Sequence, residues 1–175
     1  LLPMDQELFM KAYFQALGQK CISLSLDEKA MISAIWAATK AMMKNDGSMT
    51  NETLCWKVID EQMGGNILER KNLLTAFYEH EFCTIGNHVT PDPRAKQCVT
   101  RLKEKGYMLI LATTPLFPRV ATLERIRWAG LSPDDFSLIS TYETFSHTKP
   151  NPDYYREVLQ KCEKQPQECL LIGND

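Results

Sequence analysis

A short apolar run followed at once by a polar turn constrains the fold of this chain more than any other stretch. The run extends from Tyr107 to Ala112, after Gly106, and is followed by the turn Thr113-Thr114-Pro115. An apolar run of this length predicts a strand that is buried on both faces, because it does not alternate with polar residues. Strands of this kind form the centre of parallel α/β sheets, so the chain is expected to contain such a sheet.

A helical pattern begins near Arg119, directly after this turn. In open parallel sheets, ligands bind outside the carboxyl ends of the strands, and the free N–H groups of a following helix favour anions. The stretch therefore predicts a phosphate or carboxylate site near Thr113.

The two halves of the chain differ in their hydrophobic patterning. The first half shows apolar residues at helical spacing and no convincing strand, with helices expected at 5–17, 27–43, 50–63 and 69–82. The second half alternates, with helices expected at 94–105, 119–129 and 153–162 and strands at 107–112, 136–139 and 169–172. Because alternation predicts a parallel sheet, we expect an all-helical insert or cap over residues 1–85 and an α/β core over residues 86–175.

Local signals set some of the expected helix ends. Gly18 is expected to end the first helix, and the pair Gly64-Gly65 is expected to end the third. Thr50, together with Thr53, offers an N-cap for the third helix.

Charge and cysteine content exclude several classes of function. A formal net charge of -2 and a pI near 6.0 give no basic footprint, so nucleic acid is not an expected partner. No apolar run approaches the ~20 residues that a membrane helix needs, so no membrane partner is expected and the expected location is cytoplasmic. The six cysteines are scattered without a CxxC pair, which is typical of reduced cysteine in a chain of this size.

Three polar clusters follow expected strands or stand at a stiff turn. They are Thr113-Thr114, Thr148-Lys149-Pro150 and Asn174-Asp175. Because parallel strands point the same way, the first and third should meet at one edge of the sheet, and the lysine loop could fold over it. This combination suits a phosphate group. Hydroxyl and N–H groups donate hydrogen bonds to its oxygens, a lysine offsets its charge, and a carboxylate holds a divalent cation. Each cluster also has an ordinary explanation, since Thr113-Thr114 and Asp175 could be helix caps and Lys149 could be a solvated lysine.

The segments around these clusters resemble a known family. LILATTPLFP, HTKPNPDYY and LLIGND are similar to the second, third and fourth motifs of the haloacid dehalogenase (HAD) superfamily. The pairing of KPNPDYY with a later apolar strand and GND is fairly specific. The helical first half is similar to the C1 cap that these proteins insert after their first motif. The resemblance implies a Rossmann-like parallel sheet core with an all-helical cap.

By this resemblance the protein is expected to be a magnesium-dependent phosphatase that acts on a small phosphorylated metabolite, a phosphomonoester, through an aspartyl-phosphate intermediate. Thr113 would bind a phosphoryl oxygen together with the backbone N–H of Thr114, and Lys149 would hold nucleophile and phosphate together. Asp175 would help to hold Mg²⁺. Asn174 is the alternative ligand, because the fourth motif commonly reads Gly-Asp. The family often has Asn where Thr114 stands, which alters contacts to the substrate more than contacts to phosphate.

The first motif of the family, DxDGT, has no counterpart in this chain, and no DxD occurs in it. The resemblance therefore implies that the nucleophilic and acid/base aspartates, the first strand and the C-terminal part of the core lie outside the chain. Without the first strand, the sheet would lack its central member and expose two strand edges. We expect this chain alone to be unstable or to aggregate, and the missing segment to raise its melting temperature.

Two other functions stay open from the sequence. A 2-haloacid dehalogenase-like hydrolase would use the aspartate nucleophile without a metal, and the acid in the fourth motif argues mildly against it. A catalytically inactive HAD-like module that binds a partner would fit a chain without the first motif. Specificity in capped members is set by cap residues, for which Phe9, Tyr13 and Phe14 are candidates, although their helical spacing favours core packing.

Overall fold

The computed structural model describes residues 4–173, apart from the side chain of His88. Within these residues the α-helices are α1 (Gln6–Ser23), α2 (Glu28–Met42), α3 (Asn51–Gln62), α4 (Lys71–Glu79), α5 (Pro93–Glu104), α6 (Arg119–Trp128) and α7 (Pro152–Cys162). The strands are β1 (Ile110–Leu111) and β2 (Leu138–Ile139). Short 3₁₀-helices are η1 (Ile67–Arg70), η2 (Phe82–His88), η3 (Pro133–Asp135) and η4 (Pro166–Glu168). Helices come first and strands then alternate with helices, as predicted.

Side-chain caps determine where several helices begin. The carboxylates of Asp5 and Asp27 cap α1 and α2. Thr50 caps α3, as predicted, by accepting a hydrogen bond from the N–H of Thr53 at 3.2 Å. Asn151 caps α7 with its side-chain oxygen. Each cap satisfies an N–H group that has no partner within its own helix, so these helix starts are set locally.

The predicted end of the first helix at Gly18 is wrong, because α1 continues through this residue to Ser23. Gly18 is buried, and a Cβ atom placed on it would lie 2.3 Å from Oε1 of Glu28, the first residue of α2. The glycine therefore allows the side chain of α2 to approach, rather than stopping the helix. Gly64 and Gly65, with φ of 88° and 86°, do follow the end of α3, as predicted.

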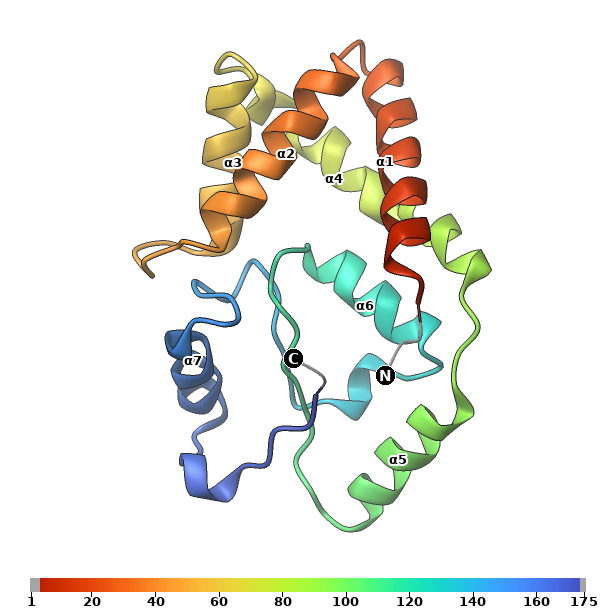
Figure 1. Cartoon of the computed structure of the whole chain (residues 1–175), viewed down its shortest axis with the longest axis vertical. Coiled ribbons are helices and arrows are strands. Elements are labelled where there is room, and N and C mark those ends of the chain that lie inside the picture. The colour runs from red at the N-terminus through yellow and green to blue at the C-terminus, as the bar shows by residue number, and fades with distance from the viewer. Residues whose placement is uncertain (1–3, 174–175) are drawn as a thin grey trace.

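The helical part (α1 to η2) is held together by aromatic side chains. Phe9 and Tyr13 of α1, Phe77 of α4 and Phe82 of η2 are buried, and their rings contact one another. The cluster extends to Trp128 of α6, whose ring stacks on Phe82 with centroids 5.1 Å apart. The helical part therefore packs on α6, as Figure 1 shows. The predicted boundary between residues 85 and 86 lies within η2, and the division into cap and core stays a prediction.

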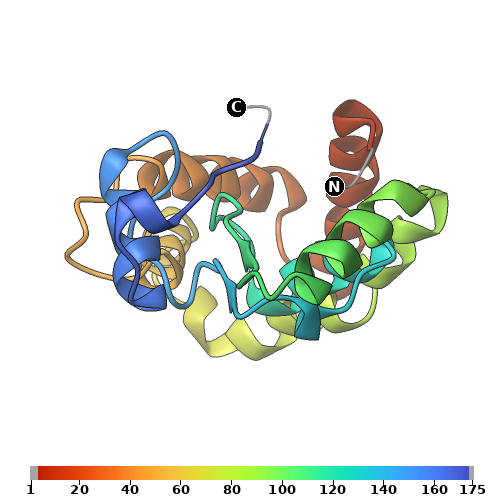
Figure 2. The same cartoon turned by 90° about the horizontal axis from the view of Figure 1, so that it is seen from below.

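The sheet part (α5 to residue 173) is an α/β arrangement. β1 and β2 pair in parallel, with Ile110 opposite Leu138 and Leu111 opposite Ile139. The first pair packs with core side chains of α7, and the second pair with those of α5 and α6. Figure 2 shows α7 and α5 on opposite sides of the strands. A parallel sheet with helices on both faces is the predicted fold class. Among residues 4–173, no helix combines the length and apolar character that a bilayer crossing requires.

β1 is shorter and less buried than predicted. Ile110 and Leu111 form the strand and are half-buried, whereas Tyr107 and Met108 are 62% and 51% exposed. Within the described residues the sheet order is β1-β2, so β1 has a strand neighbour on one edge. The exposure of Tyr107 and Met108 and the half-burial of β1 show that the prediction of a strand buried on both faces is wrong for this structure.

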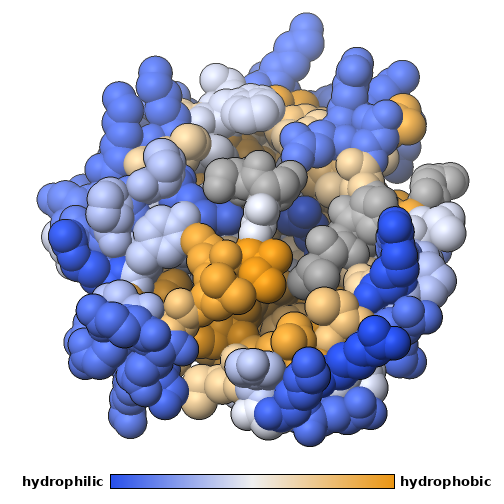
Figure 3. All heavy atoms as spheres, turned by 60° about the horizontal axis from the view of Figure 1, so that its bottom comes forward, coloured by the Kyte–Doolittle hydropathy of each residue, from blue (hydrophilic) through white to orange (hydrophobic). Residues whose placement is uncertain are grey.

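The predicted last strand, residues 169–172, is also wrong for this structure. No strand is assigned there among the described residues, and Leu170, Leu171 and Ile172 are 85%, 61% and 78% exposed. An extended segment becomes a buried strand only when a neighbouring strand pairs with its N–H and C=O groups. Among residues 4–173, the sheet order gives this segment no such neighbour. Figure 3 shows apolar surface exposed in the middle of one face of the molecule.

Candidate functional site

The carbonyl of Thr113, just after β1, is held by two hydroxyl groups. Ser140 Oγ and Tyr154 Oη each donate a hydrogen bond to it at 2.7 Å. In return, Thr113 Oγ1 donates to the carbonyl of Ser140 at 3.0 Å. Ser140 follows β2 and Tyr154 belongs to α7. These bonds join the carboxyl ends of both strands to α7 and fix the backbone at the predicted anion site.

Ser140 and Tyr154 were not singled out from the sequence. Both side chains are buried, at 1% and 0% exposed. Burial raises the pKa of Tyr154 to about 12, so the phenol keeps its proton and remains a donor. Ser140 is the first polar residue after the expected strand 136–139. Thr113 was predicted as a site residue from the same position after its own strand, so this signal could have indicated Ser140 as well. No comparable signal shows that the Tyr154 hydroxyl turns back to β1.

The hydroxyl of Thr113, the predicted phosphoryl ligand, is engaged with Ser140 in this structure. To donate to a phosphoryl oxygen, it would have to rotate away from the Ser140 carbonyl. Thr114 is half-buried, and its carbonyl accepts a hydrogen bond from the N–H of Leu116 at 2.9 Å. This bond closes a tight turn, so Thr114 stays next to the end of β1.

Lys149 lies in a loop whose first half is tied to α7. The carboxylate of Glu157, on α7, accepts hydrogen bonds from the N–H of Ser146 at 3.1 Å and from the N–H of His147 at 3.2 Å. The imidazole Nδ1 of His147 lies 3.3 Å from the same carboxylate. Glu157 therefore fixes the backbone that leads into Lys149.

The second half of the Lys149 loop is tied to α7 as well. The N–H of Asn151 donates to the carbonyl of Thr148 at 3.0 Å, and the side chain of Asn151 caps α7. Lys149 is half-buried between these anchored positions. Because Tyr154 of α7 also bonds to Thr113, this helix links the Lys149 loop to the Thr113 turn.

The predicted metal ligands, Asp175 and Asn174, lie outside the described residues. Among residues 4–173, no group of three or more His, Cys, Asp or Glu side chains could hold a metal ion. The structure thus links two of the three predicted clusters through α7, and the position of the third stays a prediction.

The aromatic residues considered for substrate specificity serve packing. Phe9 and Tyr13 are 7% and 3% exposed and belong to the aromatic core, and the hydroxyls of Tyr13 and Tyr78 lie 2.8 Å apart. The ring of Phe14 lies against Trp36, with centroids 5.5 Å apart. The core-packing interpretation is confirmed for Phe9 and Tyr13.

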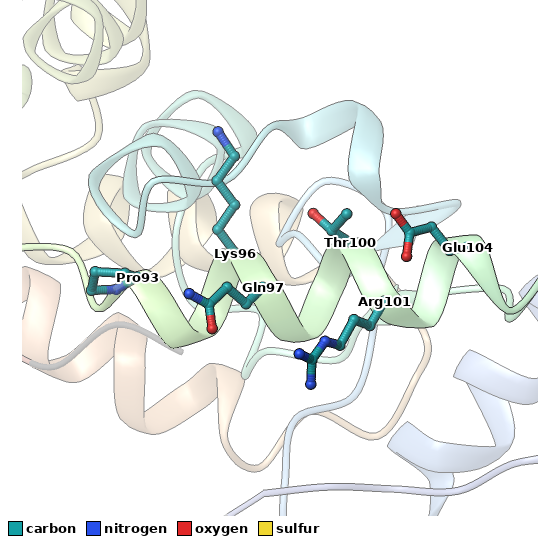
Figure 4. Close-up of a pocket in the computed structure, with 6 residues that line it drawn as sticks. All are labelled: Pro93, Lys96, Gln97, Thr100, Arg101 and Glu104. Carbon is teal, nitrogen blue, oxygen red and sulfur yellow. The ribbon is translucent and has the colours of Figure 1, made fainter.

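Two surface hollows are not lined by the described residues of the two loops. One of about 510 Å³ runs along α5, and Figure 4 shows that Lys96 and Arg101 in its lining extend to opposite sides of the helix. Another of about 540 Å³ lies between α3, α4 and the start of α6, and its Lys71 is paired with Glu52 at 2.9 Å. Ligand sites need polar groups that converge. Among the described residues, those of the Thr113 turn and the Lys149 loop line neither hollow.

Comparison with known proteins agrees with the resemblance seen in the sequence. A family model described as haloacid dehalogenase-like hydrolase matches residues 9–175. The chain is also similar to a protein from Oceanobacillus iheyensis named pyrophosphatase PpaX, with 27% identity over 103 residues. The match covers 59% of this chain and 47% of that protein, so the chain spans about half the length of this relative. With a parallel sheet between helices and a helical part before it, the chain belongs to the haloacid dehalogenase-like hydrolase family.

Proposed function

We propose that this HAD-like hydrolase is a cytoplasmic phosphatase that releases phosphate from a small phosphorylated metabolite. The observation that carries the proposal is the link between the Thr113 turn and the Lys149 loop through α7, made by Tyr154 and Glu157. Hydroxyl, N–H and lysine groups at the carboxyl end of a parallel strand suit a phosphoryl group. The name of the relative PpaX supports phosphate chemistry, so pyrophosphate belongs beside phosphomonoesters among the substrates to test.

In this proposal, Thr113 and the N–H of Thr114 bind a phosphoryl oxygen, and Lys149 offsets the negative charge of the phosphoryl group in the transition state. This chain contains no DxD pair, so the proposal requires nucleophilic and acid/base aspartates supplied from outside it. Attack of the nucleophilic carboxylate on phosphorus forms an aspartyl phosphate and expels the leaving oxygen. Water then attacks phosphorus, which releases phosphate and restores the carboxylate.

Mg²⁺ is the proposed cofactor, with Asp175 or, as the alternative, Asn174 as its ligand from this chain, because hard cations prefer carboxylate and carbonyl oxygens. A bound Mg²⁺ ion would neutralise part of the phosphoryl charge. Both residues lie outside the described ones, so no step above runs through the metal.

The test is phosphate release from a panel of small phosphomonoesters and pyrophosphate, by the full gene product. We expect turnover that EDTA abolishes and added Mg²⁺ restores. Lys149→Ala is expected to lower kcat about 10²- to 10³-fold, because a preorganised charge on the transition state is lost. Lys11→Ala, on the exposed face of α1, is the matched control and should stay within about twofold of the parent.

Two results would contradict the proposal. Turnover that Lys149→Ala leaves intact would place the reaction elsewhere in the protein. A folded gene product that turns over none of these compounds would favour the alternatives, and release of halide from a 2-halo acid would then identify a dehalogenase rather than an inactive binding module.

A further inference from the structure

A buried asparagine of the helical part bonds to both loops of the candidate site. Asn51 is the first residue of α3 and is 0% exposed. Its side-chain Nδ2 donates to the carbonyl of Pro115 at 3.2 Å, in the turn that holds Thr113 and Thr114. Its backbone N–H donates to the carbonyl of Phe145 at 2.8 Å, just before the segment that Glu157 anchors.

Neighbouring residues hold Asn51 in this position. Asn45, which is 7% exposed, donates from Nδ2 to Asn51 Oδ1 at 2.8 Å. This bond orients the Asn51 amide so that its nitrogen faces Pro115. The N–H of Glu52 donates to the carbonyl of Tyr142 at 2.8 Å, which adds a second main-chain bond beside that of Asn51.

The cost of burying the Asn51 side-chain amide indicates what this side chain contributes. Burying an amide without hydrogen bonds is unfavourable, whereas an apolar side chain of similar size would fill the same space without that cost. The bonds to Pro115 and from Asn45 offset the desolvation, and they also fix a direction that an apolar side chain could not. The amide therefore contributes orientation of the Pro115 turn more than it contributes packing.

We propose that Asn51 is a positioning residue for the candidate site, and that it holds the Thr113-Thr114 turn and the Lys149 loop in register with each other. This inference rests on the proposed phosphatase function. Docking of the helical part then sets the distance between the groups that bind the phosphoryl oxygens. A displacement of about 1 Å in such groups can cost about 10²-fold in rate, because the reacting atoms lose alignment.

The first test follows backbone amides by ¹⁵N–¹H NMR in the full gene product, and it does not depend on any activity. Asn51→Ala removes the side-chain bond to Pro115 but keeps the main-chain bond to Phe145, so it is expected to shift the amide signals of Thr113 and Thr114 more than that of Lys149. Met31→Ala, in the core of the helical part, lowers stability without touching these loops and should leave those signals in place. Equal shifts in the two variants, or none in Asn51→Ala, would overturn the proposal.

The second test separates binding from turnover. Asn51→Ala is expected to lower kcat about 10- to 100-fold with KM changed less than about threefold, because misplacement affects the transition state most. Met31→Ala should keep the parental kcat per folded molecule. A loss confined to KM, or the same kcat loss in both variants, would contradict positioning.

Asn45→Ala keeps the test decisive if Asn51→Ala does not fold. It leaves both Asn51 bonds possible but frees the amide to rotate, so a smaller loss of kcat and smaller shifts at Thr113 and Thr114 are expected. Parental signals and kcat in Asn45→Ala would count against the proposal. If the parent turns over no phosphate compound, the proposed function fails, and the NMR shifts alone decide whether Asn51 positions the loops.

Discussion

The core of the helical part and the expected strands of the sheet part differ in how far their apolar side chains are buried. In the helical part, Met31, Phe77 and Phe82 are at most 1% exposed. In the sheet part, Leu170 and Ile172 are 85% and 78% exposed, and the residues of β1 are half-buried. Both parts contain apolar segments, so the difference lies in how those segments find partners.

Backbone hydrogen bonding explains the difference. A helix satisfies most of its N–H and C=O groups from its own residues, so α1 to α4 need only pack their apolar faces together. A strand satisfies them through neighbouring strands, which come from distant parts of a chain. A helical region can therefore satisfy its backbone groups locally while its side chains pack, whereas a parallel sheet is complete only when every strand has its neighbours.

The largest expected effect comes from completing the sheet. A form of the protein extended upstream of Leu1 and downstream of Asp175 should be more stable than this chain by on the order of 5 kcal/mol, because each buried Leu or Ile contributes ~1.5–3 kcal/mol. In calorimetry the melting temperature should rise by about 10 °C or more. Leu171→Asp is the control and should destabilise the extended form much more than this chain. Equal melting temperatures and equal cooperativity in the two forms would remove the contrast between the two parts.

Truncation of one apolar side chain in each part sharpens the comparison. Phe82→Ala is expected to cost about 3–5 kcal/mol, because it opens a cavity in the aromatic core. Leu171→Ala in this chain should change the free energy of unfolding by less than about 0.5 kcal/mol, because the side chain is 61% exposed. Urea denaturation measures both. Comparable losses would show that Leu171 is buried in solution.

A smaller loss than that of Phe82→Ala is expected for the link from α7 to β1. Tyr154→Phe removes the hydrogen bond to Thr113 and should cost about 1 kcal/mol at pH 8, since Ser140 still donates to that carbonyl.

The cost should depend on pH. Burial raises the pKa of Tyr154 from 10.0 to about 12, so above pH 10 the unfolded chain loses a proton that the folded chain keeps. The stability that this group contributes is complete below pH 10 and is lost as the pH rises toward 12. In urea titrations, the advantage of the parent over Tyr154→Phe should therefore shrink over this range. A constant difference from pH 8 to pH 11 would mean that the phenol is not buried.

Local structure was predictable where local chemistry decides it. Thr50 caps α3 through the N–H of Thr53, and both residues belong to one turn. Gly18 failed as a helix stop because its role depends on Glu28 of the next helix. The predicted length of β1 was wrong because it also depends on distant residues. Its length is set by the strands that lie beside it rather than by its own apolar residues.

The candidate site was predictable only in part. Thr113 and Lys149 were predicted from their positions after a strand and in a stiff turn, and the structure links their loops through α7, while their roles stay predictions. Asn51 and Tyr154 were missed because their partners lie far along the chain, 64 positions away for the bond to Pro115 and 41 for the bond to Thr113. Such contacts follow from tertiary packing, which a single sequence does not encode in any local pattern.

The start of α3 has a consequence for how the protein can change. Asn51 and Glu52 donate from main-chain N–H groups to the main-chain carbonyls of Phe145 and Tyr142. Because side chains do not take part in these two bonds, most substitutions at the junction leave them intact, and only proline would remove a donor. The helical part can therefore exchange exposed residues while these two main-chain bonds to the sheet part are preserved, so its surface can diversify without loss of the contact between the two parts.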